Sequence, residues 1–305
     1  MELEHKPAEV DPRVLAEIGN LAFRARLVAD SVLHGMHRSR HHGTSVEFAE
    51  HKEYAPGDNV RHLDWRAFAR HDRDYIKRYL DESHVRAWLV IDSSKSMGYQ
   101  PAAARATKLE YAKLCGGALA YLLARQGDAI GLATFAERLE IEVPSRARRG
   151  HLMEMLTELE ALVPNGSTKL TDALDALAQG MTRRTIVVLF SDLFDAGEGA
   201  LDAIARLAAK KHDVVLFHLL DPDELELPFE DHTEFVSMED DRSVAADPHS
   251  IRAAYREEIR RFLRDVELRA RAAHVEHLVL RTDQSPGEAL GRFLARRMAL
   301  RTTAR

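Results

Sequence analysis

The chain has 305 residues, of which 45% are hydrophobic and 30% charged, and its formal net charge at pH 7 is -6. This composition is typical of a folded globular protein and excludes extensive disorder, while the mild acidic balance argues against a nucleic-acid partner. The single cysteine, Cys115, excludes an intrachain disulfide, and no segment has the apolar length of a membrane helix or the apolar core of a signal peptide. We therefore expect a cytoplasmic protein without a membrane segment.

The first part of the chain predicts a helix followed by a small unit with strands. Apolar residues recur at helical spacing over 11–33, and the polar, His-rich residues 34–42 predict a loop. Residues 44–84 combine extended segments with a turn at 56–58, and 75–79 predict a strand. We assign residues 1–85 to this N-terminal helix and its appended strand-and-turn unit.

From residue 86 onward, apolar strands alternate with amphipathic helices. The predicted strands are 87–91, 129–135, 139–143, 185–190, 214–220 and 277–280, and the predicted helices are 102–125, 149–162, 171–181, 199–209, 250–273 and 287–296. This alternation predicts an α/β domain over 86–300, with a doubly wound, mainly parallel sheet covered by helices on both faces. The pattern is interrupted near 222–248, where we expect an inserted hairpin or loop.

Oxygen-bearing side chains follow two of the predicted strands. Three of them, Asp92, Ser94 and Ser96, come directly after strand 87–91, and Asp192 follows strand 185–190. A third loop, just before a predicted helix, contributes Thr168. Ligands of open α/β sheets bind at the carboxyl ends of the strands, and hydroxyl and carboxylate oxygens suit hard cations such as Mg²⁺ or Mn²⁺. Each piece taken alone is also explained by a turn or a helix cap, so the joint pattern carries the prediction.

The order Asp-x-Ser-x-Ser, threonine loop and later aspartate resembles the metal-ion-dependent adhesion site of the von Willebrand factor A fold. The resemblance implies that Ser94, Ser96 and Thr168 bind the metal directly. It also implies that Asp92 and Asp192 hold waters and orient the serines, and that one coordination position stays open for an acidic residue of a partner.

Three positions depart from that pattern. The threonine loop has Ser167, and Leu193 follows the second aspartate, where members of the fold commonly have glycine. In addition, Lys95 lies between the two serines, and we expect its positive charge to weaken cation binding.

A second resemblance covers residues 43–98. The segments 43–50, 54–58, 61–65 and 76–79, continuing into 92–97, resemble a widespread bacterial family of unknown function whose members are encoded beside MoxR-type AAA+ ATPases. The resemblance implies an adaptor that acts with a MoxR-type AAA+ ATPase, or with the client protein of that ATPase, in chaperone-like assembly or maturation.

Two functions of different classes stay open. The first is a non-enzymatic binding module that recruits an acidic residue of a partner through its metal. The second is a metal-dependent phosphatase or hydrolase with Asp92 as the nucleophile, but such enzymes need a second aspartate where this chain has Ser94. No base for activating water and no phosphate-binding Walker loop are recognisable. We favour the binding module and assign no catalytic residue.

Overall fold

The computed structural model describes residues 20–40, 51–53, 75–77, 85–100, 106–148, 150–194, 199–240 and 242–303. Contacts divide the chain into two units, one formed by Met1–Met36 with Val85–Arg305 and the other by His37–His84. In the second unit, β1 (His51–Glu53) pairs with β2 (Tyr75–Lys77) in antiparallel orientation. The strand predicted at 75–79 is present over the three described residues, and most of the segments predicted at 44–74 lie outside the described ranges.

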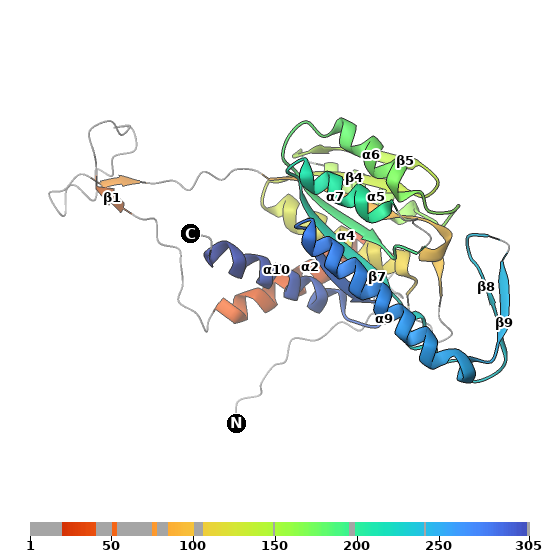
Figure 1. Ribbon diagram of the computed structural model, residues 1–305. Helices are drawn as coiled ribbons and strands as arrows, with labels where there is room; N and C mark the ends of the chain where they lie inside the picture. The colour runs from red at the N-terminus through yellow and green to blue at the C-terminus, as the bar shows by residue number, and fades with distance from the viewer. Residues whose placement is uncertain are drawn as a thin grey trace, which may run out of the picture. The chain divides into compact units, whose positions relative to one another are not determined.

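A six-stranded sheet forms the centre of the first unit (Figure 1). Its strands lie in the order β10-β7-β6-β3-β4-β5, and every neighbouring pair is parallel except β4 with β5. The short connection between these two strands leaves no room for the crossover that a parallel pair needs. The predicted α/β class with a mainly parallel sheet is confirmed, with strands β3 (Arg86–Asp92), β4 (Ala129–Phe135), β5 (Leu139–Arg146), β6 (Ile186–Ser191), β7 (Asp213–Leu220) and β10 (Glu276–Arg281).

Helices cover both faces of this sheet. One buried core contains residues of α2 (Leu21–Arg40), α4 (Lys108–Arg125), α5 (His151–Ala161) and α10 (Pro286–Thr303). The other contains residues of α6 (Leu170–Gly180), α7 (Ala200–Ala209) and α9 (Pro248–Ala272). Alternate residues of β3 enter opposite cores, which explains why that strand is a continuous apolar run. No helix in the described part of the chain has the length and apolarity needed to cross a membrane.

The N-terminal helix differs from the prediction. Helix α2 continues to Arg40, so the loop predicted over 34–42 is wrong for residues 34–40, and residues 11–19 lie outside the described ranges. Apolar side chains at Val28, Val32 and Met36 are spaced four residues apart and pack toward the first core, which extends the helix. Residues 21–36 of the helix therefore group with the sheet by their contacts.

Helix α4 was predicted to begin at residue 102; residues 102–105 lie outside the described ranges, and residues 106 and 107 precede the helix. Thr107 is the N-cap, and its side chain accepts a hydrogen bond from the backbone N–H of Glu110 at 3.1 Å. The cap makes Lys108 the first helical residue, at the edge of the sheet where β3 and β6 end.

The interruption expected near 222–248 contains a short helix and a hairpin. Helix α8 (Pro222–Glu226) follows β7 directly, and β8 (Thr233–Val236) pairs with β9 (Ser243–Ala246) in antiparallel orientation. Figure 1 shows this hairpin as a separate two-stranded ribbon beside the start of α9.

Candidate functional site

The predicted site residues lie where the connections of the sheet change direction. After β3 the chain continues into β4 and β5 on one side, and it then returns to β6 on the other side of β3. A crevice outside the carboxyl ends of two such strands is the usual ligand site of an open α/β sheet. Asp92 is the last residue of β3, and Asp192 directly follows the last residue of β6.

The carboxylate of Asp92 accepts hydrogen bonds from three separate segments. Its Oδ1 atom accepts a hydrogen bond from the backbone N–H of Ser94 at 2.9 Å. Its Oδ2 atom accepts hydrogen bonds from the hydroxyls of Ser191 at 2.7 Å and Thr168 at 3.1 Å. The side chain is fully buried, and burial followed by the nearby Asp192 carboxylate raises the pKa of Asp92 to about 6, against the lowering effect of these hydrogen bonds.

The three predicted hydroxyl ligands lie near this carboxylate, two beside it and the third beside one of these two. We call Ser94, Ser96 and Thr168 the hydroxyl cluster. The Oγ atoms of Ser94 and Ser96 lie 3.1 Å apart, and Thr168 reaches the same carboxylate as Ser94. An octahedral Mg²⁺ ion with oxygen ligands at about 2.1 Å separates adjacent ligands by about 3 Å, so this spacing fits such an ion. Four of the five predicted residues are therefore brought together.

The carboxylate of the fifth predicted residue, Asp192, forms an ion pair with a lysine. Its Oδ2 atom lies 2.6 Å from the Nζ atom of Lys108, and its Oδ1 atom accepts a hydrogen bond from the backbone N–H of Phe194 at 3.1 Å. The same ammonium group donates to Glu224. Burial alone would lower the pKa of Lys108, but the two carboxylates outweigh it and the pKa is raised. The lysine is thus a buried cation held between two acids.

The lysine that pairs with a predicted site residue is Lys108 rather than Lys95. Lys95 is exposed, and its backbone N–H donates to the carbonyl of Gly166 at 3.1 Å. Lys108, in contrast, has no exposed surface. The signal that would have found it is the spacing of Thr107 and Glu110, the Ser/Thr-x-x-Glu pattern of a helix start, which places residue 108 at the edge of the sheet.

Two further carboxylates approach the site from the inserted segment. The backbone N–H of Thr168 donates to the Oε2 atom of Glu239, in the turn between β8 and β9, at 3.1 Å. Glu224 lies in α8, where it forms a capping box with Asp221. The insertion therefore contributes two acidic groups to the site, and neither position was among the predicted site residues.

The residue after Asp192 has an uncommon backbone conformation. Leu193 has a φ of 56°, in the left-handed region that favours glycine, and its N–H donates to the Ser191 hydroxyl at 3.0 Å. Its side chain is buried in the second core, which accounts for a leucine at this position.

The site is built mainly from hydroxyl groups rather than from strong metal ligands. Within the described ranges, no group of three or more His, Cys, Asp and Glu side chains has the arrangement of a metal centre. Serine and threonine hydroxyls with one buried carboxylate form a weakly charged oxygen site, which suits a hard divalent cation that keeps part of its coordination for water or for another ligand.

Known proteins similar to this chain include one family and two relatives. The model of the family described as "Protein of unknown function DUF58" matches residues 50–264. The uncharacterized proteins Mb1516 of Mycobacterium bovis and Rv1480 of Mycobacterium tuberculosis are each 29% identical over 296 residues, and the alignment covers 94% of this chain and 90% of theirs. Neither name assigns an activity.

Solved structures give weaker likenesses. The conserved hypothetical protein BatB from Bacteroides thetaiotaomicron has a TM-score of 0.47 at 16% identity, covering 70% of this chain and 98% of that protein. An aerotolerance-related membrane protein from Bacteroides fragilis has a TM-score of 0.45 at 19% identity, covering 68% and 97%. At TM-scores below 0.5, these likenesses carry no conclusion about the site.

Proposed function

Because the chain belongs to the DUF58 family of proteins of unknown function, which assigns it no activity, we propose a function from its site. The protein is a non-enzymatic binding module, and residues 86–300 are a von Willebrand factor A-like domain with a metal-ion-dependent adhesion-type site. A divalent cation, Mg²⁺ or Mn²⁺, is held there by the hydroxyl cluster. The partner is a MoxR-type AAA+ ATPase or its client protein, in the cytoplasm.

One observation carries this proposal. The hydroxyls of Ser94 and Ser96 lie 3.1 Å apart beside the buried carboxylate of Asp92, which also receives the hydroxyl of Thr168. Ser96 is the least buried member of this group and also lines a neighbouring cavity, so a partner can reach it. Asp92 orients the hydroxyls, while Ser94, Ser96 and Thr168 supply the oxygen ligands.

The buried lysine adjusts the charge of the site. The carboxylates of Asp192 and Glu224 share the ammonium of Lys108, so these three side chains together carry one negative charge. With Asp92 the local charge is about -2 when all three acids are ionised, and less when Asp92 is protonated. In this proposal the charge of Asp192 is partly neutralised by Lys108. Any water that Asp192 holds for the metal bonds to the remaining lone pairs of its carboxylate.

The bound cation would keep one coordination position open, and a carboxylate of the partner would fill that position. A hydrolase is less well supported, because Asp92 is fully buried and both of its oxygens already accept hydrogen bonds. A catalytic nucleophile needs access to its substrate, and the orientation of Asp92 serves the surrounding hydroxyls instead.

Co-purification with the cognate MoxR-type ATPase tests the proposal. We expect the ATPase to be retained on the immobilised full chain in Mg²⁺ and to be lost in a chelator. Ser94→Ala should abolish the Mg²⁺ dependence. Ser93→Ala is the matched control, because the Ser93 hydroxyl bonds to the carbonyl of Phe135 at 2.9 Å and to the Oε2 atom of Glu140 at 3.2 Å rather than to the hydroxyl cluster.

Two results would contradict the proposal. Equal retention in Mg²⁺ and in chelator, with no effect of Ser94→Ala, contradicts a metal-bridged contact. Metal-dependent turnover of a phosphoester that is lost in Asp92→Ala would favour the hydrolase.

A further inference from the structure

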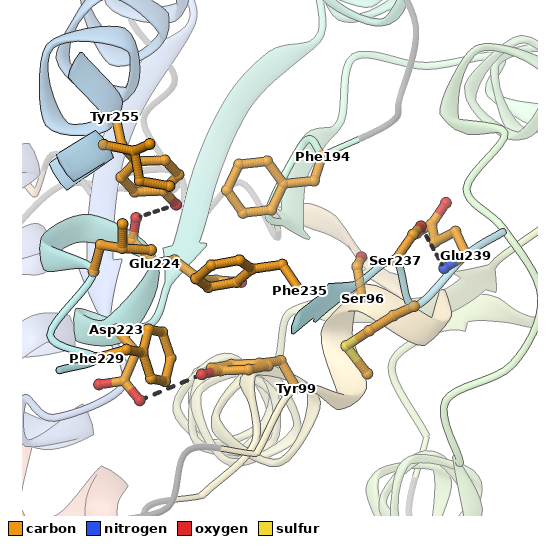
Figure 2. A pocket seen from close by; sticks show the side chains of 13 residues that line it. Ser96, Tyr99, Phe194, Asp223, Glu224, Phe229, Phe235, Ser237, Glu239 and Tyr255 are labelled. Carbon is orange, nitrogen blue, oxygen red and sulfur yellow. Dashed lines mark hydrogen bonds between the residues drawn. The ribbon is translucent and has the colours of Figure 1, made fainter. Parts of the chain in front are cut away.

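A cavity of about 380 Å³ lies directly beside the hydroxyl cluster (Figure 2). Ser96 belongs to both features, because its hydroxyl faces Ser94 and its side chain also lines the cavity. Glu239 connects them as well, since it lines the cavity and accepts the backbone N–H of Thr168. The volume lies within the range of small-ligand and side-chain pockets. A segment bound at the hydroxyl cluster can therefore extend into this cavity.

Aromatic rings from four parts of the chain form its walls. Figure 2 shows the ring of Phe235, from β8, between those of Tyr99 and Phe194. Phe229 packs against Phe235 with the ring centroids 5.7 Å apart at an interplanar angle of 73°. Tyr255, from α9, closes another side, and its hydroxyl donates to the backbone carbonyl of Glu224 at 2.7 Å. The walls offer ring faces, to which cations bind favourably.

The charged side chains that line the cavity are all acidic, namely Asp223, Glu224 and Glu239. The phenol of Tyr99 donates to Asp223 at 3.3 Å, and its pKa is raised by burial and then by the carboxylates of Asp223 and Asp221. Burial and then the carboxylate of Glu224 raise the pKa of Tyr255 to about 12. Both phenols are thus in a negative field, which favours a positively charged occupant.

The wall of this cavity already holds one cation in the same manner. The Nζ atom of Lys108 lies 5.0 Å from the ring centroid of Phe194 and bonds to the carboxylates of Asp192 and Glu224. Phe194 and Glu224 also line the cavity. A second cation on the open side meets the same combination of ring faces and carboxylates.

We propose that this cavity binds an arginine side chain of the partner protein, next to the carboxylate that the partner presents to the hydroxyl cluster. The aliphatic stem of arginine suits the apolar walls, and its planar guanidinium stacks on ring faces and pairs with carboxylates. The pairing with a partner carboxylate rests on the proposed function, whereas the binding of the cation by the cavity can be tested alone. The partner segment therefore carries an acidic residue close to an arginine.

Ligand-observed saturation-transfer NMR on the full chain tests the inference with three probes. These are the N-acetyl amides of arginine, of citrulline, which is its neutral isostere, and of norleucine, which is apolar. We expect the arginine probe to bind at least about fivefold more tightly than either of the other two. Asp223→Asn should weaken its binding by a similar factor. Glu230→Gln is the matched control, because Glu230 is exposed and does not line the cavity.

Each other outcome overturns the inference. Equal binding of the arginine and citrulline probes removes the role of charge, and equal binding of norleucine leaves only an apolar contact. Absence of binding by all three probes would show that the cavity binds none of these side chains.

Mg²⁺ binding by the wild-type chain separates this inference from the proposed function. Arginine binding to a wild-type chain that fails to bind Mg²⁺ supports the cavity and contradicts the metal site. Mg²⁺ binding without arginine binding does the reverse.

Discussion

The Nζ atom of Lys108 lies 2.6 Å from the Oδ2 atom of Asp192, and neither side chain has any exposed surface. The pair joins the first residue of α4 to the end of β6, while Glu224 of α8 completes it from the end of β7. A buried charge is stable only when it is paired and hydrogen-bonded, so this contact fixes three elements at the candidate site.

Replacing the lysine tests how strongly the fold depends on this contact. Lys108→Met keeps the apolar stem but leaves the carboxylates of Asp192 and Glu224 buried without their cation. We expect it to lower the free energy of unfolding by about 3–5 kcal/mol, measured by urea denaturation. Lys95→Met, at an exposed position, should change it by less than about 0.5 kcal/mol. Similar effects of the two substitutions would show that the buried contact contributes little.

The pH dependence of stability should carry the signature of His218. This residue is fully buried, and its Nε2–H donates to the backbone carbonyl of Asp192 at 2.9 Å, so the ring Nδ1 accepts from His277 at 3.2 Å. Burial, and then the neighbouring His277, lowers the pKa of His218 to about 3 from its ordinary value of 6.5. The unfolded chain therefore binds a proton here at a pH where the folded chain does not.

The sign of the effect follows from linkage. The contribution of the neutral His218 side chain to the free energy of unfolding is complete above pH 6.5. It is lost as the pH falls from 6.5 toward 3, by about 1.4 kcal/mol per pH unit. Asp92, whose pKa is raised to about 6, has the opposite sign but affects wild type and variant alike. Between pH 7.0 and 5.0, wild type should lose about 2 kcal/mol more than His218→Gln. His249→Gln, at an exposed position, should follow wild type, and parallel losses in all three proteins would refute the assignment.

A turn at the end of α7 offers a test of the backbone geometry. Lys211 is exposed and has a φ of 67°, where a side chain is strained, whereas Lys210 has a φ of -75°. Lys211→Gly should raise the free energy of unfolding by about 0.5–1 kcal/mol, because glycine adopts this conformation without strain. Lys210→Gly should lower it by a similar amount. Destabilisation by both changes would argue against a left-handed residue at 211.

The parallel sheet was predictable because its strands are buried on both faces and read as apolar runs, as residues 87–91 and 214–220 do. The boundaries were less predictable. The start of α4 depends on the local cap at Thr107, and the end of α2 depends on packing of Met36 against a core that the sequence does not display. Such details follow from tertiary contacts rather than from periodicity.

The site was predictable where it follows strand ends and unpredictable where it depends on long-range pairing. Asp92, Ser94 and Thr168 converge because their loops lie at one edge of the sheet. Lys108 pairs with Asp192, 84 positions away, and with Glu224, 116 positions away, and nothing local in the sequence links them. An ion pair between distant segments has no periodic signal, so the structure was needed to find it.

Isothermal titration of the chelator-stripped full chain with Mg²⁺ tests the central claim most directly. The account predicts one bound ion per chain in wild type, an affinity at least about tenfold weaker in Ser94→Ala because a direct ligand is lost, and an unchanged affinity in Ser93→Ala. No detectable binding to wild type, or equal affinities for wild type and Ser94→Ala, would contradict a cation held by the hydroxyl cluster.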